Sequence, residues 1–339
     1  MFDAVVGHRR AKQLLEAALR GRPGHAYLIA GPEAVGKSTL ARTFAQALGC
    51  EAPVEERPCG RCRSCRLFAA GAHPDFREID RTTGQEERRS ARAARNIPIE
   101  AVRALQHDAS LTAHLGGYKV YLIVGAEDLS LSAMDALLKT LEEPAPNVVI
   151  VLTATDVGLL PATVVSRCQV VKLGLVPTDE IAAALVERHG LDAERADLIA
   201  HVAAGRPGRA LDLAREGEGL AERAEKLGEL VQLDAGTKTE RLKGAEKLAQ
   251  AHSKSPESTE RWLELLLLWW RDVLLVRACC EELVVNRDRL EALRKRAGGL
   301  SVAEAHRALR AIEQTSQYLT ENVQVRIALE YLLVSLPAA

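Results

Sequence analysis

The hydrophobic positions of this 339-residue chain change their spacing at about residue 174. Before it, helical patterns alternate with short β-branched runs such as Lys119–Val124, Val148–Thr153 and Val170–Leu173. Short apolar runs between helical patterns are typical of a parallel sheet covered by helices. Residues 1–174 are therefore predicted to form an α/β core.

After Pro177 the strand pattern disappears, and apolar residues recur at helical spacing. We expect a small helical domain over residues 175–214 and an all-helical domain over residues 215–339. The apolar stretch Leu263–Trp270 is closed by Arg271 and Asp272, so it is too short to span a membrane. It predicts a buried core helix, although such residues at helical spacing also suit an interface with partner helices.

Residues 31–38 read Gly-Pro-Glu-Ala-Val-Gly-Lys-Ser, a complete phosphate-binding loop. The apolar run His25–Ala30 precedes it and the helical pattern Thr39–Leu48 follows, a setting that an ordinary glycine-rich turn lacks. The glycines let backbone N–H groups face a phosphate, the lysine adds a cation, and the serine hydroxyl suits Mg²⁺. ATP or ADP with Mg²⁺ is the expected ligand. The expected contact residues are Gly31, Gly36, Lys37, Ser38 and Thr39.

The acidic residues that hydrolysis needs are displaced. An active enzyme of this kind ends a second strand with carboxylates that hold the metal and orient water. Here Val124 and Gly125 occupy those places, and Glu127 and Asp128 follow too late. We interpret these two carboxylates as capping and solvating a helix predicted over Ser132–Glu143. The sequence thus predicts nucleotide contact without intrinsic hydrolysis.

Four of the seven cysteines lie within sixteen positions in the pattern C-x8-C-x2-C-x2-C. This spacing suits a tetrahedral, structural zinc site, and Arg61, Arg63 and Arg66 are expected to help keep the sulfurs deprotonated. Two disulfides are the alternative. The chain begins with an amphipathic helical pattern and not with a signal peptide, so a reducing cytoplasm is expected and zinc is favoured. The predicted Zn²⁺ ligands are Cys50, Cys59, Cys62 and Cys65.

The overall charge and the remaining three cysteines say less about function than these motifs do. With 45 basic and 46 acidic side chains, the chain has no global attraction to nucleic acid. The stretch from about His73 to Pro98 mixes both signs and is interpreted as a solvated excursion, with a DNA-binding strip as the alternative. We expect Cys168, Cys279 and Cys280 to be buried as small apolar residues.

Further motifs accompany the phosphate loop: Val6–His8, Ala136–Pro144 (Ala-Leu-Leu-Lys-Thr-Leu-Glu-Glu-Pro) and Ser166–Cys168 (Ser-Arg-Cys). With the cysteines placed just after the loop's helix, they make the chain resemble the bacterial clamp-loader AAA+ family of DNA polymerase III. The pair Ala126-Glu127 is similar to delta-prime subunits, whereas the nearest competitors, the tau/gamma motor subunits, keep Asp-Glu-x-His. Asn322–Glu330 is similar to the delta-prime collar domain, and the resemblance is weakest over about 215–255.

The resemblance implies an AAA+ P-loop core over residues 1–174 with a zinc-binding insertion at about 50–66, then a helical lid and a collar. It also implies a cytoplasmic, non-hydrolysing stator without membrane contact. Such a subunit belongs to a ring with tau/gamma and delta subunits that opens a sliding clamp and places it on primed DNA. In this family the arginine of the Ser-Arg-Cys motif, here Arg167, enters the neighbouring subunit's ATP site as an arginine finger. Simple pairing across a helix end is the other interpretation.

Two departures concern nucleotide use. The sensor arginine of the motor subunits falls at Gly208, and Arg209 lies one helical position on, a rotation of about 100° that points it away from this chain's own phosphates. In contrast, Lys37 and Ser38 are intact, although some delta-prime proteins lack the loop lysine. We therefore expect static nucleotide binding. Two other functions stay open: an active tau/gamma-like motor ATPase, and a zinc module that binds nucleic acid by itself.

Overall fold

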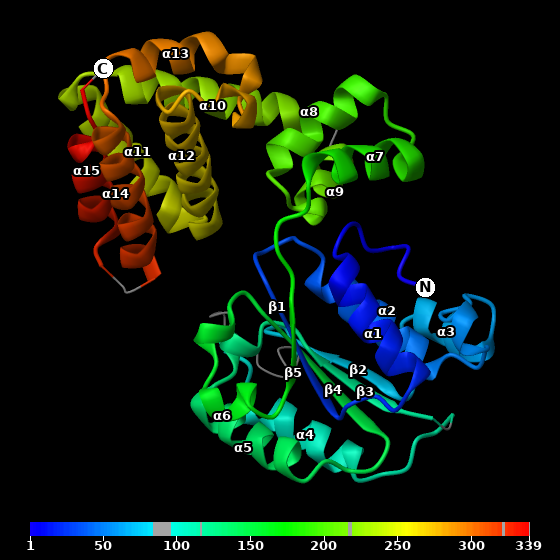
Figure 1. Cartoon of the computed structure of the whole chain (residues 1–339). Coiled ribbons are helices and arrows are strands. Elements are labelled where there is room, and N and C mark those ends of the chain that lie inside the picture. The colour runs from blue at the N-terminus through cyan, green and yellow to red at the C-terminus, as the bar shows by residue number, and fades with distance from the viewer. Residues whose placement is uncertain (84–95, 116, 216–218, 321–322, 339) are drawn as a thin grey trace. The chain divides into compact units, whose positions relative to one another are not determined.

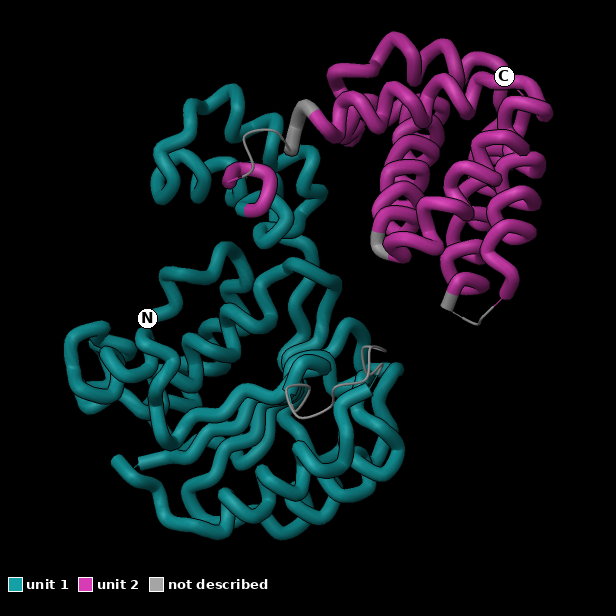
Figure 2. The backbone as a smooth tube through the Cα atoms, turned by 180° about the vertical axis from the view of Figure 1, so that it is seen from behind, with its two compact units in different colours: residues 1–211 teal, residues 212–339 magenta. Residues whose placement is uncertain are grey.

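The computed structural model describes residues 1–83, 96–115, 117–215, 219–320 and 323–338. The chain divides into two compact units, residues 1–211 and 212–339 (Figure 2). This boundary is close to the expected start of the last domain. The first unit contains both the predicted core and the helices that follow it, so the division between residues 174 and 175 stays a prediction.

In the described part of the first unit, five parallel strands form the centre: β1 (Ala26–Ala30), β2 (Phe76–Ile79), β3 (Lys119–Ile123), β4 (Val148–Ala154) and β5 (Gln169–Lys172). Their order in the sheet is β2-β3-β4-β1-β5 (Figure 1). β1, β3 and β4 are buried along their whole length, which explains their unbroken apolar sequences. At its carboxyl end, β1 pairs Ala30 with Ala154 and with Lys172. The loop after β1 therefore begins at the carboxyl end of a strand that has neighbours on both sides.

The edge strand β2 corrects one prediction. The stretch His73–Pro98 is not a solvated excursion throughout, because Phe76–Ile79 pairs with β3. Ile79 is buried, whereas Arg77 is exposed. Charged residues are common on edge strands, and they hide the strand from a search for apolar runs. Residues 84–95 of this stretch lie outside the described residues, and so does that part of the interpretation.

Helices cover both faces of the sheet (Figure 1). Leu15 and Phe44 pack against one face, and Leu105 and Leu137 pack against the other. The first face carries α1 (Arg9–Arg20) and α2 (Lys37–Gly49); the second carries α4 (Ile99–Ala109), α5 (Leu131–Glu142) and α6 (Ala162–Val165). The remaining described elements of this unit are η1 (Val54–Glu56), α3 (Arg63–Ala69), η2 (Ala126–Asp128), η3 (Val157–Leu159), α7 (Thr178–His189) and α8 (Ala193–Ala203). The helix α9 (Pro207–Arg215) begins in this unit and crosses its boundary after Leu211.

The second unit is helical, and its described elements are α10 (Gly219–Ala235), α11 (Lys238–Lys254), α12 (Pro256–Arg277), η4 (Glu281–Leu283), η5 (Arg287–Arg289), α13 (Leu290–Gly298), α14 (Val302–Thr320) and α15 (Val325–Ser335). Trp269 and Trp270 are buried in its core, which confirms the core helix predicted at Leu263–Trp270. The Arg296 guanidinium lies 4.6 Å from the ring centre of Trp270 and donates to Asp234 at 2.8 Å. Among the described helices, none is both long and apolar enough to cross a bilayer.

Candidate functional site

The phosphate loop lies where the sequence predicts it, between β1 and α2. Ala34 and Gly36 have φ angles of 56° and 105°, a conformation that lets successive N–H groups surround an anion. α2 begins at Lys37, so its positive N-terminal end lies at the same place. A Cβ at Gly31 would lie 2.2 Å from the carbonyl oxygen of Leu173. The loop therefore has the geometry of an anion site, and only glycine fits at its first position.

Replacing Gly31 with alanine is expected to distort the loop, because the new methyl group collides with backbone and not with a movable side chain. We expect the free energy of unfolding to fall by about 2 to 4 kcal/mol and nucleotide binding to be lost. Urea unfolding and nucleotide titration measure the two effects. Gly174→Ala is the matched control, since a Cβ at Gly174 meets open space. Equal stability of the two variants would contradict the prediction.

Lys37 bridges the loop. Its Nζ donates to the carbonyl oxygens of Gly31 and Pro32 at 2.7 and 2.8 Å. Burial lowers the pKa of this ammonium group, while the carboxylates of Glu127 and Glu33 act in the opposite direction. The carbonyl oxygens are acceptors that a phosphate oxygen would replace with a stronger, charge-assisted bond.

A cavity of about 410 Å³ opens beside the loop, at the carboxyl ends of β3 and β4. Lys37 and Ser38 line it, whereas Thr39 is not among the described residues that do. The wall combines hydroxyl groups with both signs of charge, which suits a hydrated metal and phosphate better than an apolar ligand. Its acidic residues are Glu33, Asp80, Glu127 and Asp128, and its basic residues are Lys37 and Arg81.

The structure overturns the interpretation of Glu127 and Asp128 as helix caps. α5 is capped by Ser130, whose hydroxyl oxygen accepts from the N–H of Ala133. The turn η2 instead carries Glu127 to the cavity, where its Oε1 accepts from the N–H and the hydroxyl of Thr155 at 2.9 and 2.8 Å. Asp128 lies on the same wall and forms an ion pair with Arg81. Both carboxylates therefore belong to the cavity.

Arg167 lies just after the C-cap of α6 and is not among the described residues that line this cavity. Its guanidinium donates to the carboxylate of Glu142 and to the carbonyl oxygen of Thr163, each at 2.7 Å. The side chains of Arg167 and Glu142 are 34% and 50% exposed. An exposed pair of this kind contributes about 0–1 kcal/mol, so Arg167 can exchange Glu142 for another anion. In the single chain it pairs across helix ends and remains accessible.

Gly208 joins α9 to the phosphate loop. Its N–H donates to the carbonyl oxygen of Ala34 at 2.8 Å, and a Cβ at this position would lie 2.9 Å from that oxygen. This close approach of two backbones leaves no room for an arginine at position 208. Arg209, the next residue of α9, is not among the described residues on the wall of the loop cavity.

A second cavity, of about 280 Å³, lies between the N-terminal segment and the helices α7 and α9. Its lining is mainly apolar and includes Val6, Ile181 and Pro207. The His8 ring is joined to the carbonyl oxygen of Val35 by a 2.8 Å hydrogen bond, which ties this segment to the phosphate loop. Sequence patterns do not reveal the cavity, because separate segments of the chain contribute its walls. An apolar lining of this kind suits a largely apolar group.

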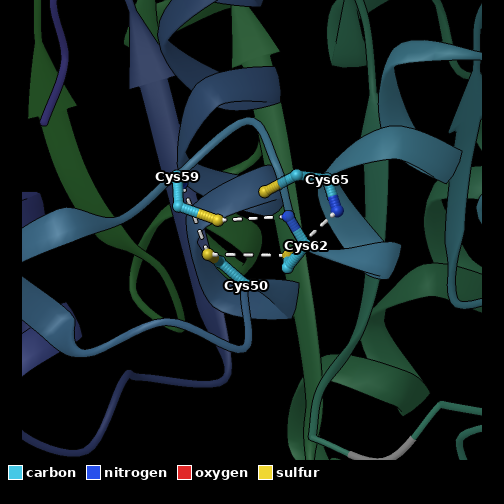
Figure 3. A group of neighbouring side chains, drawn as sticks. All are labelled: Cys50, Cys59, Cys62 and Cys65. Atoms are coloured by element: carbon cyan, nitrogen blue, oxygen red, sulfur yellow. Dashed lines mark hydrogen bonds between the residues drawn. The ribbon is translucent and has the colours of Figure 1, made fainter.

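The four predicted zinc ligands converge (Figure 3). Cys50 ends α2, Cys62 caps α3 by accepting from the N–H of Cys65, and Cys59 lies in the intervening loop. Their Sγ atoms all lie within 4.8 Å of one another. Tetrahedral zinc with bonds of about 2.3 Å separates its sulfurs by roughly 3.8 Å, which is compatible with this cluster. All seven cysteines are free thiols, so neither disulfide of the alternative interpretation is present.

Backbone amides, and not the neighbouring arginine, favour the thiolate of Cys59. The N–H groups of Arg61 and Cys62 lower the pKa of Cys59 to about 6. The Arg61 guanidinium, which was expected to stabilise the thiolates, instead forms an ion pair with Glu56 at 2.6 Å. Burial has the opposite effect on Cys65 and raises its pKa to about 12. A divalent cation at the centre of the cluster would favour the thiolate form of all its ligands.

The remaining cysteines are less buried than expected. Cys279 is exposed, and Cys168 and Cys280 are half-buried. Burial raises the pKa of Cys168 to about 11. The prediction is wrong for Cys279 because α12 ends at Arg277 and the chain turns at the surface, with a φ of 59° at Cys279.

Two family profiles match most of the chain. The profile described as DNA polymerase III, delta subunit, matches residues 7–176. The profile described as DNA polymerase III, delta subunit, C terminal, matches residues 218–337. The chain belongs to this DNA polymerase III delta-subunit family. Its two matches cover the P-loop core and the second helical unit separately.

Relatives of this delta-subunit family member include two kinds of subunit. DNA polymerase III subunit delta′ of Haemophilus influenzae is 35% identical over 207 residues, 60% of this chain and 59% of that protein. The delta′ subunit of Pseudomonas aeruginosa is 40% identical over 159 residues, 46% of each chain. Subunit tau of Bacillus subtilis is 38% identical over 170 residues, 50% of this chain and 28% of that one. The chain thus spans 28% to 59% of these relatives.

A solved structure supports the fold of this family member over nearly its whole length. The DNA polymerase III gamma subunit-related protein of Thermotoga maritima is 17% identical, with a TM-score of 0.50. The match covers 95% of this chain and 96% of that one. It confirms the predicted AAA+ P-loop core followed by helical parts.

Some site residues of this delta-subunit family member could not be predicted from sequence motifs. Thr155, which holds Glu127, and the pair Asp80 and Arg81 lie on the cavity wall outside any recognised motif. Their positions offered a signal, since Thr155 follows β4 and Asp80 follows β2 directly. Ligands of open α/β sheets bind beyond the carboxyl ends of the strands, where these residues lie.

Proposed function

We propose that this chain is a non-hydrolysing stator subunit of a DNA polymerase III clamp loader, and that it donates Arg167 to the ATP site of a neighbouring motor subunit. Membership of the delta-subunit family and similarity to delta′ and tau subunits support the clamp-loader role. The observation that carries the finer role is the place of Arg167, accessible and away from its own chain's phosphate cavity. At the position of Arg167, a planar and permanently charged guanidinium can stabilise a γ-phosphate only if another chain supplies that phosphate.

The chain's own loop favours binding over turnover. Val124 and Gly125 bring no carboxylate to the end of β3, and Glu127 reaches the cavity with one oxygen already bonded to Thr155. Gly208 stands where the motor subunits carry their sensor arginine, in backbone contact with the loop. These features support a subunit that holds nucleotide without hydrolysing it.

The proposed ligand is ATP or ADP with Mg²⁺. Gly31 and Gly36 shape the loop, while Lys37 and Ser38 would meet the phosphates and the metal. Thr39 continues the first turn of α2. The 280 Å³ apolar cavity would hold the base. Mg²⁺ supplies neutralisation of the phosphate charge.

The isolated chain is expected to bind ATP and ADP and to hydrolyse neither. Isothermal titration measures binding, and steady-state phosphate release measures turnover. Lys37→Ala is expected to weaken binding about ten- to a hundredfold, the size of one lost charge-assisted contact. No binding at millimolar nucleotide would refute static occupancy. Robust hydrolysis by the isolated chain would favour the alternative function, an active tau/gamma-like motor in which Glu127 replaces the missing acids.

The proposed role of zinc is structural. Cys50, Cys59, Cys62 and Cys65 would hold Zn²⁺ and join the end of α2 to α3. The alternative of a zinc module that binds nucleic acid has less support, because the charge of Arg61 is paired with a carboxylate.

The proposed partners follow from the clamp-loader role. They are tau/gamma and delta subunits in a hetero-oligomeric ring, and the sliding clamp and primed DNA through that complex. We place this assembly in the cytoplasm. Similarity to subunits named tau and delta′ supports these partners.

A further inference from the structure

One carboxylate oxygen of the loop cavity has no partner in the described part of the chain. Oε1 of Glu127 accepts two hydrogen bonds from Thr155, which fills its two lone pairs. Oε2 of Glu127 is buried and accepts no hydrogen bond from the described residues. A buried carboxylate oxygen is costly unless a donor or a cation meets it. We therefore expect a ligand of this cavity to supply the missing partner of Oε2 of Glu127.

The other carboxylates of the cavity are accounted for. Asp128 forms an ion pair with Arg81. One oxygen of Asp80 accepts hydrogen bonds from the N–H groups and hydroxyls of the threonines at 82 and 83. Glu33 is exposed, so water solvates it. Among the described residues of this wall, Glu127 is thus the acidic one with a buried oxygen left to satisfy.

The missing partner must be a cation or a hydrogen-bond donor. Lys37 lines the same cavity, but its Nζ is held by carbonyl oxygens of the loop, and a bound phosphate would attract it further. Mg²⁺ prefers oxygen ligands, keeps several waters and binds proteins through one or two carboxylates together with substrate phosphates. Ser38 brings a hydroxyl to the same wall.

We propose that Glu127 binds the divalent cation of a metal–nucleotide complex, directly or through one of its waters, in place of the acids missing at Val124 and Gly125. This inference rests on the proposed nucleotide binding and specifies its ligand as the magnesium complex of a nucleoside di- or triphosphate. Because Thr155 occupies Oε1, Glu127 has one oxygen for the cation and none for a hydrolytic water. The same contacts that hold the nucleotide then leave it intact.

The test is the affinity of the full chain for ADP and ATP in Mg²⁺ and in excess EDTA. The proteins are the wild type, Glu127→Gln and Glu33→Gln. Glu33 is the matched control because it also lines the cavity and its carboxylate also raises the pKa of Lys37. Unlike Glu127, Glu33 is exposed. Removing Mg²⁺ is expected to weaken binding to the wild type and Glu33→Gln by about tenfold or more. For Glu127→Gln, removing Mg²⁺ is expected to change the nucleotide affinity by less than about threefold.

Two outcomes would overturn this inference alone. One is an equal Mg²⁺ dependence in the wild type and Glu127→Gln. The other is tighter binding by Glu127→Gln in both conditions, since the carboxylate would then act by repelling phosphate. No binding of either nucleotide by the wild type would overturn the nucleotide proposal and this inference together, while the role of Arg167 would stand.

A second measurement needs no variant and so does not depend on the folding of one. With Mn²⁺ and ADP bound to the wild type, NMR signals of Glu127 and Ser38 are expected to broaden before those of Glu33. Broadening of Glu33 first would place the cation elsewhere and overturn the assignment.

Discussion

Replacing Arg167 with alanine is expected to lower ATP hydrolysis at the neighbouring subunit's site by about 10³-fold, the lower end of the range for arginine fingers. A guanidinium in that position neutralises charge on the γ-phosphate oxygens, and alanine leaves the charge unmatched. Arg167 is held by an exposed pair with Glu142, so reaching a phosphate in another chain requires no rearrangement of a buried group. The nucleotide affinity of this chain's own loop is expected to stay unchanged.

The measurement is single-turnover and steady-state ATP hydrolysis by cognate motor subunits with the clamp and primed DNA, reconstituted with the wild-type chain or a variant. Arg167→Lys keeps the charge but lacks the planar fork, so it is expected to restore little. Glu142→Gln removes the partner and keeps the arginine, and it is expected to stay within about threefold of the wild type. Full stimulation by Arg167→Ala would contradict the role in trans and leave this residue with a pairing role only.

Removing zinc is expected to open the insertion around residues 50–66 and to destabilise the first unit. Cys65 is fully buried and Cys50 nearly so, and the cluster joins the end of α2 to α3. Structural zinc contributes about 10–16 kcal/mol in zinc-finger peptides. Because both faces of the sheet have hydrophobic cores of their own, we expect a smaller loss, about 3 kcal/mol or more in the free energy of unfolding for Cys65→Ser.

Metal analysis and thermal unfolding check this prediction. The wild type is expected to contain one zinc per chain, and Cys65→Ser and chelator-treated protein are expected to unfold at lower temperature. Cys279→Ser is the matched control, because Cys279 is exposed and lies outside the cluster. Stimulation through Arg167 is expected to survive wherever the protein remains folded. If Cys59→Ser folds normally but abolishes clamp loading, the metal has a direct functional role instead.

The strands buried on both faces and the edge strand β5 were predictable, whereas the other edge strand, β2, was not. β3 and β4 have unbroken apolar sequences because helices cover both of their faces. β2 carries Arg77 and Glu78, which form ion pairs with Asp108 and Arg42. These charges make its sequence look like a solvated loop. On an edge strand such charges are favourable, since one side lacks a neighbouring strand.

By itself the sequence determined the features whose chemistry is local along the chain. The phosphate loop occupies residues 31–38 and the cysteines lie within sixteen positions, so short turns suffice to bring their groups together. Only the tertiary structure decided the places of Glu127 and Arg167. Glu127 accepts hydrogen bonds from Thr155, 28 positions away along the chain, and Arg167 donates to Glu142, 25 positions away. Parallel pairing sets the carboxyl ends of β3 and β4 side by side whatever their separation in sequence, and packing of the whole sheet therefore decides which carboxylate reaches the loop.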